Sequence, residues 1–240
     1  MHKIFSGAGV ICAFSTRSDG NMSYAYGDTK DSLKHRKAFL SAIGIDYRDL
    51  TCAKQAHGDQ IACVRLIDKG KGALLNATSL VDIDALVTNQ PQLPLAIFTA
   101  DCLSIFLYEP KVKAIGIVHA GWRGTQREIT LKTAQVMKKK FGAAYENIRA
   151  AFGPAIRGCC YEVGEDFKHY FDHGLSQKDS RYYFDLAAVN GEQLLDAGVR
   201  EENITDTKIC TSCRNKEFFS FRKEGKSCGR LMSVMMLGRA

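Results

Sequence analysis

The pattern of apolar and polar positions predicts a chain of short strands and amphipathic helices. Apolar runs and polar–apolar alternation predict strands at 10–15, 50–67 with a break at 57–59, 81–88, 95–107 with a break at 99–102, 114–118, 147–152, 203–210, 217–221 and 231–237. Apolar residues at helical spacing predict helices at 31–43, 126–141, 162–171 and 186–197. Because the sequence shows no internal repeat and no linker-like segment, we expect one mixed α/β domain over residues 1–240.

The stretch AIGIVHAGWRGT at 114–125 is the centre of the predicted functional site. Its apolar start has the character of a strand, glycines interrupt it, and a helical pattern follows. This arrangement places His119 and Arg123 on a strand-to-helix turn, where a rigid scaffold can present them for chemistry. Trp122, the only tryptophan of the chain, lies between them.

Two other strand breaks carry residues that suit catalysis or metal binding. His57 lies at the first break, and Asp101 and Cys102 interrupt the apolar run at 95–107. A carboxylate in such a run needs a partner, so Asp101 is either a structural pairing residue or a site residue. His57, Cys102 and His119 form a donor set that zinc accepts, with a fourth position left open as in catalytic sites. Their long spacing leaves a purely structural role for each residue open as well.

The remaining cysteines form no complete pattern in the sequence. The chain has nine, an odd number at irregular spacing, which favours reduced thiols over a disulfide framework. Cys210 and Cys213 with Cys228 resemble the start of a zinc ribbon, but a clear fourth ligand is lacking. Cys159 and Cys160 are adjacent, and a redox role stays open for them. We expect these cysteines to pack as small hydrophobic residues.

Charge and hydropathy narrow the classes of partner. The net charge of +7 is spread along the chain, and its densest cluster, at 138–140, ends a predicted helix. The sequence shows no nucleic-acid recognition motif, whereas a mildly basic protein suits an acidic small molecule such as phosphate. The N-terminus lacks a signal-peptide layout, and no apolar segment approaches the roughly 20 residues of a membrane span. We therefore expect a cytoplasmic protein, without membrane or nucleic-acid partners, and a monomer.

Five motifs resemble one known family, in the family's order. They are KQAHG at 54–58, TADC at 99–102, HAGWRGT at 119–125, GPAI…CCYEV at 153–163 and FFSFRKEG…GR at 218–230. On these motifs the chain resembles the YfiH family, also called the multicopper polyphenol oxidase or laccase-domain family, over nearly its whole length. The resemblance implies a sandwich of mixed β-sheets flanked by helices.

The resemblance also implies a metal site and an activity. The family's zinc ligands match His57, Cys102 and His119, with copper as the alternative metal. The implied activity is phosphorolysis of purine nucleosides (adenosine, inosine, guanosine and methylthioadenosine), with adenosine deaminase activity at the same site. In the early loop the family often carries a double glycine after its arginine. This chain departs from that pattern with Arg17-Ser-Asp-Gly-Asn, so the motif does not define the contact of Arg17.

Phosphorolysis requires a phosphate beside C1′ of the ribose and stabilisation of charge on the leaving purine. Arginine suits phosphate because its guanidinium fork matches the phosphate oxygens. Arg123 is the first candidate, and the further substrate- or phosphate-binding candidates are Arg17, Gln55, Arg222 and Arg230. We expect the metal to bind phosphate, polarise a substrate oxygen or activate water for deamination. We expect Asp101 to orient a metal ligand or accept a proton.

Three rival hypotheses use the same residues. A four-copper laccase needs more than the six histidines present, and no His-X-His pair occurs, which leaves only a weak copper-dependent oxidation at the single site. A metal-free cysteine hydrolase would use Cys102 as nucleophile and His119 as base, but it has no role for His57. A non-catalytic binding module has no role for any of the three.

Overall fold

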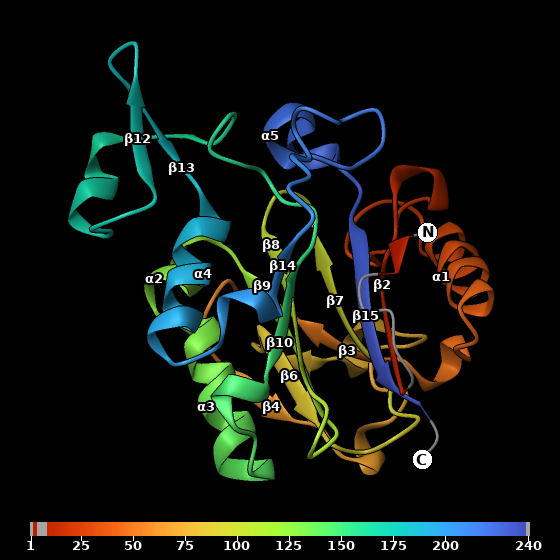
Figure 1. The fold of residues 1–240 in the computed structure, drawn as a ribbon. Coiled ribbons are helices and arrows are strands. Elements are labelled where there is room, and N and C mark those ends of the chain that lie inside the picture. The colour runs from red at the N-terminus through yellow and green to blue at the C-terminus, as the bar shows by residue number, and fades with distance from the viewer. Residues whose placement is uncertain (1, 4–8, 239–240) are drawn as a thin grey trace.

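Two six-stranded sheets lie face to face in the computed structural model, which describes residues 2–3 and 9–238 (Figure 1). The first sheet contains, in spatial order, β1 (His2–Lys3), β2 (Val10–Phe14), β15 (Leu231–Leu237), β7 (Leu95–Thr99), β3 (Thr51–Lys54) and β5 (Leu80–Val81). The second contains β14 (Ile204–Asp206), β10 (Arg149–Phe152), β8 (Leu103–Glu109), β9 (Ala114–Ala120), β6 (Ala85–Thr88) and β4 (Ile61–Cys63). Each sheet combines parallel and antiparallel pairs, so the predicted mixed α/β sandwich is confirmed.

The second sheet is covered on both faces, which explains its continuous apolar strands. Successive side chains of a strand point to opposite faces. In β9, Val118 contributes to the core on the helix side, whereas Ile115 and Ile117 contribute to the core between the sheets. His119 shares the face of Ile115 and Ile117, so the strand period directs it into the space between the sheets at the end of β9.

Helices cover the outer faces of the sandwich (Figure 1). They are α1 (Thr29–Ala42), α2 (Trp122–Gln126), α3 (Ile129–Phe141) and α4 (Leu186–Asp196), whereas the short α5 (Phe221–Glu224) lies at one end of the sandwich. Phe39 and Leu40 of α1 pack on the first sheet, and α3 and α4 pack on the second. Asp28 is the N-cap of α1, and its side chain accepts hydrogen bonds from the backbone N–H groups of Lys30 and Asp31.

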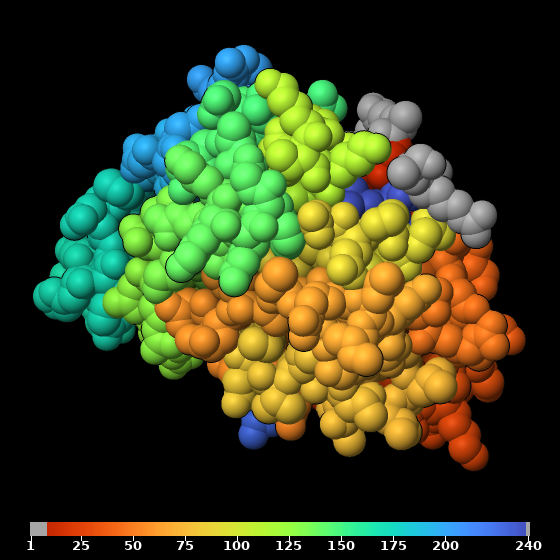
Figure 2. Space-filling view, turned by 90° about the horizontal axis from the view of Figure 1, so that it is seen from below, coloured from red at the N-terminus to blue at the C-terminus, as the bar shows by residue number. Residues whose placement is uncertain are grey.

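A three-stranded sheet lies outside the sandwich (Figure 1). It consists of β11 (Glu162–Val163), β13 (Arg181–Phe184) and β12 (Leu175–Lys178). Phe184 contacts the Phe167 ring edge-to-face and the Phe171 ring at a tilt, which joins this sheet to the core on the helix side. Figure 2 shows the end of the sandwich opposite α5, where the chain between β3 and β7 spreads between α1 and α3. In the described part of the chain, no helix combines the length and apolarity needed to cross a membrane.

Both predicted strand breaks are points where the chain crosses from the first sheet to the second. The break at 57–59 separates β3 from β4, and the break at 99–102 separates β7 from β8. The prediction of one half-exposed strand at 81–88 is wrong. Asp82, with a positive φ of 57°, separates β5 from β6, and β6 is wholly buried because both faces of its sheet are covered.

Two predicted helices also differ from the structure. The helix predicted at 126–141 is divided between α2 and α3, because Glu128 has a left-handed backbone with φ of 59°. The helix predicted at 162–171 is wrong. Its first two residues form β11 by pairing with β13, and only a 3-10 helix, Glu165–His169, follows.

The structure differs from the sequence predictions at further places in the C-terminal third of the chain. The strand predicted at 203–210 is limited to β14, and the chain turns at Lys208, where φ is 54°. The strand predicted at 217–221 is wrong, because the Phe218 N–H donates back to the Arg214 carbonyl in a turn and α5 follows. The hairpin of β12 and β13 is an element that the sequence pattern did not predict.

Candidate functional site

A cavity of about 660 Å³ opens at the end of the sandwich, next to α5. Residues at the ends of β3, β7 and β9, at the start of α2 and in α5 line it. Its aromatic wall residues are Tyr26, Phe98, Trp122, Tyr161 and Phe221. Its positively charged wall residues are Lys54, Arg123, Arg222 and Arg230. Such a wall suits a planar, partly anionic ligand.

His57, Cys102 and His119 converge on this cavity. Each offers one ligand atom, and the three atoms lie within 4.8 Å of one another. His57, with a positive φ of 59°, and Cys102 come from the two sheet crossovers. His119 belongs to β9 itself rather than to the predicted turn, because the strand continues to Ala120. The two histidine rings are 4.7 Å apart and nearly perpendicular at 80°.

Asp84 organises two of these three residues, and the sequence analysis missed it. Asp84 is fully buried, and its Oδ1 lies 2.7 Å from His119 Nδ1 and accepts the His57 N–H at 3.0 Å. Its Oδ2 accepts the N–H groups of Ala56 and Gly58 at 3.2 and 2.7 Å. The carboxylate therefore sets the backbone around His57 and leaves Nε2 of His119 for the cavity. In the apolar–polar alternation at 81–88, Asp84 shares the polar phase of Asp82, so the linear pattern carried no signal for this role.

The charges of the trio stabilise a thiolate and an imidazolium. Burial raises the pKa of Cys102, but the charge of His119 and hydrogen bonds from His119 and His57 outweigh it and lower the pKa to about 6. Burial also opposes the charged form of His119, yet the Cys102 thiolate and the Asp84 carboxylate raise the pKa of His119 to about 9. A thiolate in this place is a soft metal ligand or a nucleophile.

Gly124 in α2 is packed against the loop that carries His57, and we expect Gly124→Ala to lower the free energy of unfolding by about 1–3 kcal/mol. A Cβ there would lie 3.0 Å from the Gly58 carbonyl oxygen and 3.2 Å from Ile129 Cγ2, so backbone has to move. Urea unfolding followed by circular dichroism measures the change. Gly191→Ala in α4 is the control, since its Cβ meets only Phe152 at an ordinary 3.6 Å. Equal stabilities of the two variants would contradict the prediction.

Three arginines of the predicted phosphate-binding set lie in the cavity wall, namely Arg123, Arg222 and Arg230. The fourth, Arg17, does not line the cavity. Its guanidinium pairs with Glu224 at 2.6 Å and donates to the carbonyls of Asn215 and Phe218 at 2.9 and 3.2 Å. Arg17 therefore joins the early loop to the segment before α5, and these contacts occupy the group predicted to bind phosphate.

The three wall arginines differ in their availability to a ligand. The Arg123 guanidinium lies 4.2 Å from the centre of the Trp122 ring and makes no hydrogen bond to the described residues. Arg222 Nη1 donates to the Glu162 carbonyl at 3.0 Å, and Arg230 Nη1 is bound to backbone carbonyls of its own segment. Arg123 is thus the least engaged of the three.

Asp101 and Gln55 also line the cavity, but their polar atoms bind the protein. Asp101, at φ 85°, accepts the Thr211 hydroxyl and the Arg222 backbone N–H, both at 2.6 Å. The Gln55 amide donates to the Phe98 carbonyl and accepts the Phe98 N–H, both at 2.8 Å. Such contacts are typical of residues that position others. For Asp101 they correspond to the first of the two alternatives in the sequence analysis, a structural pairing residue.

The sequence analysis missed most of the cavity wall. Lys54, Tyr161 and Phe221 lie inside the motifs KQAHG, CCYEV and FFSFRKEG, so a place within a motif was the available signal. Tyr26 and Phe98 carry no such signal. They reach the wall only because the loop before α1 and strand β7 meet at this end of the sandwich.

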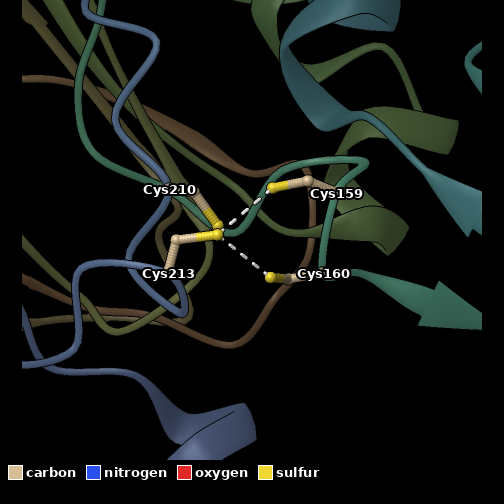
Figure 3. A group of neighbouring side chains, drawn as sticks. All are labelled: Cys159, Cys160, Cys210 and Cys213. Atoms are coloured by element: carbon tan, nitrogen blue, oxygen red, sulfur yellow. Dashed lines mark hydrogen bonds between the residues drawn. The ribbon is translucent and has the colours of Figure 1, made fainter.

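Four cysteines outside the cavity wall form a second group that can hold a metal ion (Figure 3). They are Cys159, Cys160, Cys210 and Cys213, whose sulfur atoms lie within 4.8 Å of one another. The expectation that they pack as small hydrophobic residues is wrong for Cys159 and Cys213, which are exposed. Cys228 lies elsewhere, with its sulfur 3.6 Å from Glu224 Oε1. In space the adjacent pair, rather than Cys228, completes a group of four cysteines with Cys210 and Cys213.

Comparison with known proteins finds relatives of this chain in both sequence and structure. The family model described as multi-copper polyphenol oxidoreductase laccase matches residues 11–238. Purine nucleoside phosphorylase YlmD of Geobacillus stearothermophilus is 30% identical over 95% of this chain and 90% of its own. Adenosine deaminase RL5 of an unknown prokaryotic organism is 31% identical over 86% of this chain and 82% of its own. The crystal structure of the Bacillus licheniformis hypothetical protein YfiH matches with a TM-score of 0.91 and 30% identity, over 95% and 92% of the two chains.

These matches include all the strands that carry the cavity. The structural match confirms the fold that the motif resemblance implied, and the full-length sequence matches confirm the resemblance itself. The chain therefore belongs to the multicopper polyphenol oxidoreductase laccase family, which is the family of YfiH and YlmD.

Proposed function

We propose that this chain is a zinc-dependent purine nucleoside phosphorylase for adenosine, inosine, guanosine and methylthioadenosine, and that it deaminates adenosine at the same site. One observation carries the proposal: three potential metal ligands, His57, Cys102 and His119, share one cavity with three arginines. The names of the relatives, a purine nucleoside phosphorylase and an adenosine deaminase, support the choice of substrate and of both reactions.

The residues present fit a zinc ion. Two imidazoles and one thiolate lie close enough to share it, and they leave one position open toward the cavity. Asp84 on the Nδ1 side of His119 supplies the outer carboxylate that commonly orients a metal-binding histidine. When bound, zinc supplies a Lewis acid that polarises an oxygen of the substrate or of phosphate. Copper, the alternative metal, also accepts imidazole and thiolate ligands.

The wall residues account for the positioning that phosphorolysis needs. A phosphate oxygen forms a bond to C1′ while the bond from C1′ to the purine nitrogen breaks, and the purine leaves with the electron pair and takes up a proton. Arg123, with Arg222 and Arg230 nearby, holds the phosphate through its guanidinium. The aromatic wall binds the purine ring. Asp101 positions the backbone of Arg222 and the crossover that carries Cys102.

Deamination replaces the 6-amino group of adenosine by a water oxygen and releases ammonia. It therefore requires the purine end of the substrate near the three ligands, whereas phosphorolysis requires C1′ near the arginines. A cavity that contains both the three ligands and the arginines supports both reactions on one nucleoside.

The test is the metal content of the purified chain followed by incubation with each nucleoside, with and without phosphate, and chromatography of the products. We expect free purine base only when phosphate is present, inosine from adenosine in either case, and loss of both after chelation. A zinc-loaded chain that leaves all four nucleosides unchanged overturns the proposal.

Arg123→Gln is expected to raise the KM for phosphate about tenfold while the KM for adenosine changes little. A hydrogen bond to a charged group contributes about 1.5–3 kcal/mol, and about 1.4 kcal/mol corresponds to a factor of ten. Initial rates at varied phosphate and saturating adenosine measure the effect. Arg127→Gln is the matched control, because Arg127 is exposed at the end of the same helix and does not line the cavity. Equal changes in both variants would contradict the assignment of Arg123.

A metal-free cysteine hydrolase is the second candidate, because the Cys102 thiol faces the imidazole of His119. Metal analysis combined with thiol labelling separates the two. A metal-free chain whose Cys102 is labelled by a thiol probe and which leaves nucleosides unchanged favours the hydrolase. Zinc that protects Cys102 from the probe favours the phosphorylase.

A further inference from the structure

The four-cysteine group joins two loops that are distant in the sequence. Cys159 and Cys160 belong to the loop between β10 and β11, and Cys210 and Cys213 belong to the loop after β14. In Figure 3 the four side chains extend from these two loops toward a common centre. Cys213 Sγ lies 3.6 Å from Cys159 Sγ and 3.3 Å from Cys160 Sγ.

This spacing matches the sulfur arrangement around a single tetrahedral metal ion. With zinc–sulfur bonds of about 2.3 Å, tetrahedral geometry separates neighbouring sulfurs by about 3.8 Å. Neither of these separations is a bond between sulfurs, since a disulfide requires about 2.05 Å. Four sulfurs that all lie within 4.8 Å of one another leave no room for an iron–sulfur cluster, because cysteines on different irons are held apart by the iron and sulfide ions between them.

We propose that Cys159, Cys160, Cys210 and Cys213 bind a structural zinc ion. Four thiolates complete the tetrahedral shell, so this site has no open position for substrate and serves the fold rather than the chemistry. Soft thiolate ligands in tetrahedral geometry select zinc over calcium, magnesium or manganese. The site is separate from the trio of His57, Cys102 and His119 and does not depend on the function proposed for that trio.

Contacts outside the cysteine group also hold the two loops close to each other. The Arg157 side chain joins the same two loops, because its guanidinium pairs with Asp206 at 2.7 Å and donates to the Ile209 carbonyl at 3.3 Å. The two loops are therefore already held at the distance that the zinc ion requires.

The zinc ion would brace one wall of the cavity. Ile156 and Tyr161, which flank the adjacent cysteines, line the cavity, and the Ile156 N–H donates to the Asp101 carbonyl at 2.9 Å. Thr211, between the other two cysteines, donates its hydroxyl to the Asp101 carboxylate. Both cysteine loops thus bind Asp101, the neighbour of Cys102, and a metal that joins them restrains this residue.

The experiment counts zinc in a His57→Ala/His119→Ala variant that retains all nine cysteines. Because the cavity trio loses two of its three ligands, any zinc that stays bound through extensive dialysis belongs to the cysteine group. We expect about one zinc per chain, and loss of that one equivalent when Cys210→Ser and Cys213→Ser are added. Cys63→Ser is the matched control, because Cys63 is exposed and outside both groups, and it is expected to retain the zinc.

Alkylation mapped by mass spectrometry gives a second measurement that needs no cysteine variant. In the zinc-loaded chain, Cys159 and Cys213 are expected to react only after chelation, whereas the exposed Cys63 reacts before and after. A histidine variant without zinc, or equal labelling of Cys159, Cys213 and Cys63 before chelation, overturns the proposal. A disulfide between the two loops in a metal-free chain also overturns it. Failure of the cavity trio appears separately, as a wild-type chain that contains only the cysteine-bound zinc.

Discussion

His119→Ala is expected to remove one zinc ion per chain and to lower kcat/KM for adenosine phosphorolysis by at least about 100-fold. Loss of an outer hydrogen-bond partner of a ligand already costs about 10–100-fold in metal affinity or activity, and loss of a ligand costs more. In addition, the substitution leaves the buried Asp84 carboxylate without its imidazole partner. Metal analysis together with phosphate-dependent release of adenine measures both effects.

His173→Ala is the control for this prediction. The His173 side chain is 63% exposed, faces Glu192 and does not line the cavity. Circular dichroism establishes whether both variants are folded. Only in a folded variant can a loss of activity be attributed to the site rather than to unfolding. A folded His119→Ala chain with full phosphorolysis and full zinc content refutes the assignment of the trio.

Asp84→Asn is expected to weaken zinc binding at the cavity trio by about 10–100-fold and to lower activity in parallel. Asparagine keeps the shape of the side chain, but its NH₂ group replaces one acceptor oxygen. Asp84 accepts from the backbone of Ala56, His57 and Gly58 as well as from His119, so the amide leaves at least one of these donors unpaired. The His57 loop and the His119 ring both lose their fixed orientation.

Competition with a chelator of known affinity measures the zinc affinity of this variant, and initial rates at saturating zinc show whether added metal restores activity. Asp82→Asn is the control two residues earlier in the chain, where the side chain is exposed. Similar zinc affinities for Asp84→Asn and Asp82→Asn would show that the Asp84 carboxylate does not orient the trio.

The sequence predicted strands best where the tertiary structure covers both of their faces. The apolar runs at 95–107 and 114–118 became β7, β8 and β9, because a buried strand needs apolar side chains throughout. The predictions of a helix at 162–171 and of a strand at 217–221 were wrong. There the pairing of β11 with β13, or the turn closed by the Phe218 N–H, overrides the local preference.

The candidate site shows the same division between local and long-range information. His57, Cys102 and His119 stood out because glycines or polar residues interrupt strands beside them, and the motifs of the family named them together. Asp84 did not stand out, since its role arises from contacts with residues of other strands. Arg17 stood out but lies beside Glu224, which the sequence does not bring near it.

Three properties could be predicted from the linear pattern alone: the fully apolar strands, the family that the motifs resemble and the side chains that suit metal or phosphate. These properties depend on neighbours along the chain and on residue chemistry, and both are visible in a linear pattern. Three features are visible only in the tertiary structure: the two sheet crossovers meet the end of β9, Asp84 joins the first crossover to His119, and two distant cysteine pairs face each other. The physical reason is that these contacts depend on strand order and on the stacking of the sheets, which bring together residues whose separation in sequence carries no information about their distance in space.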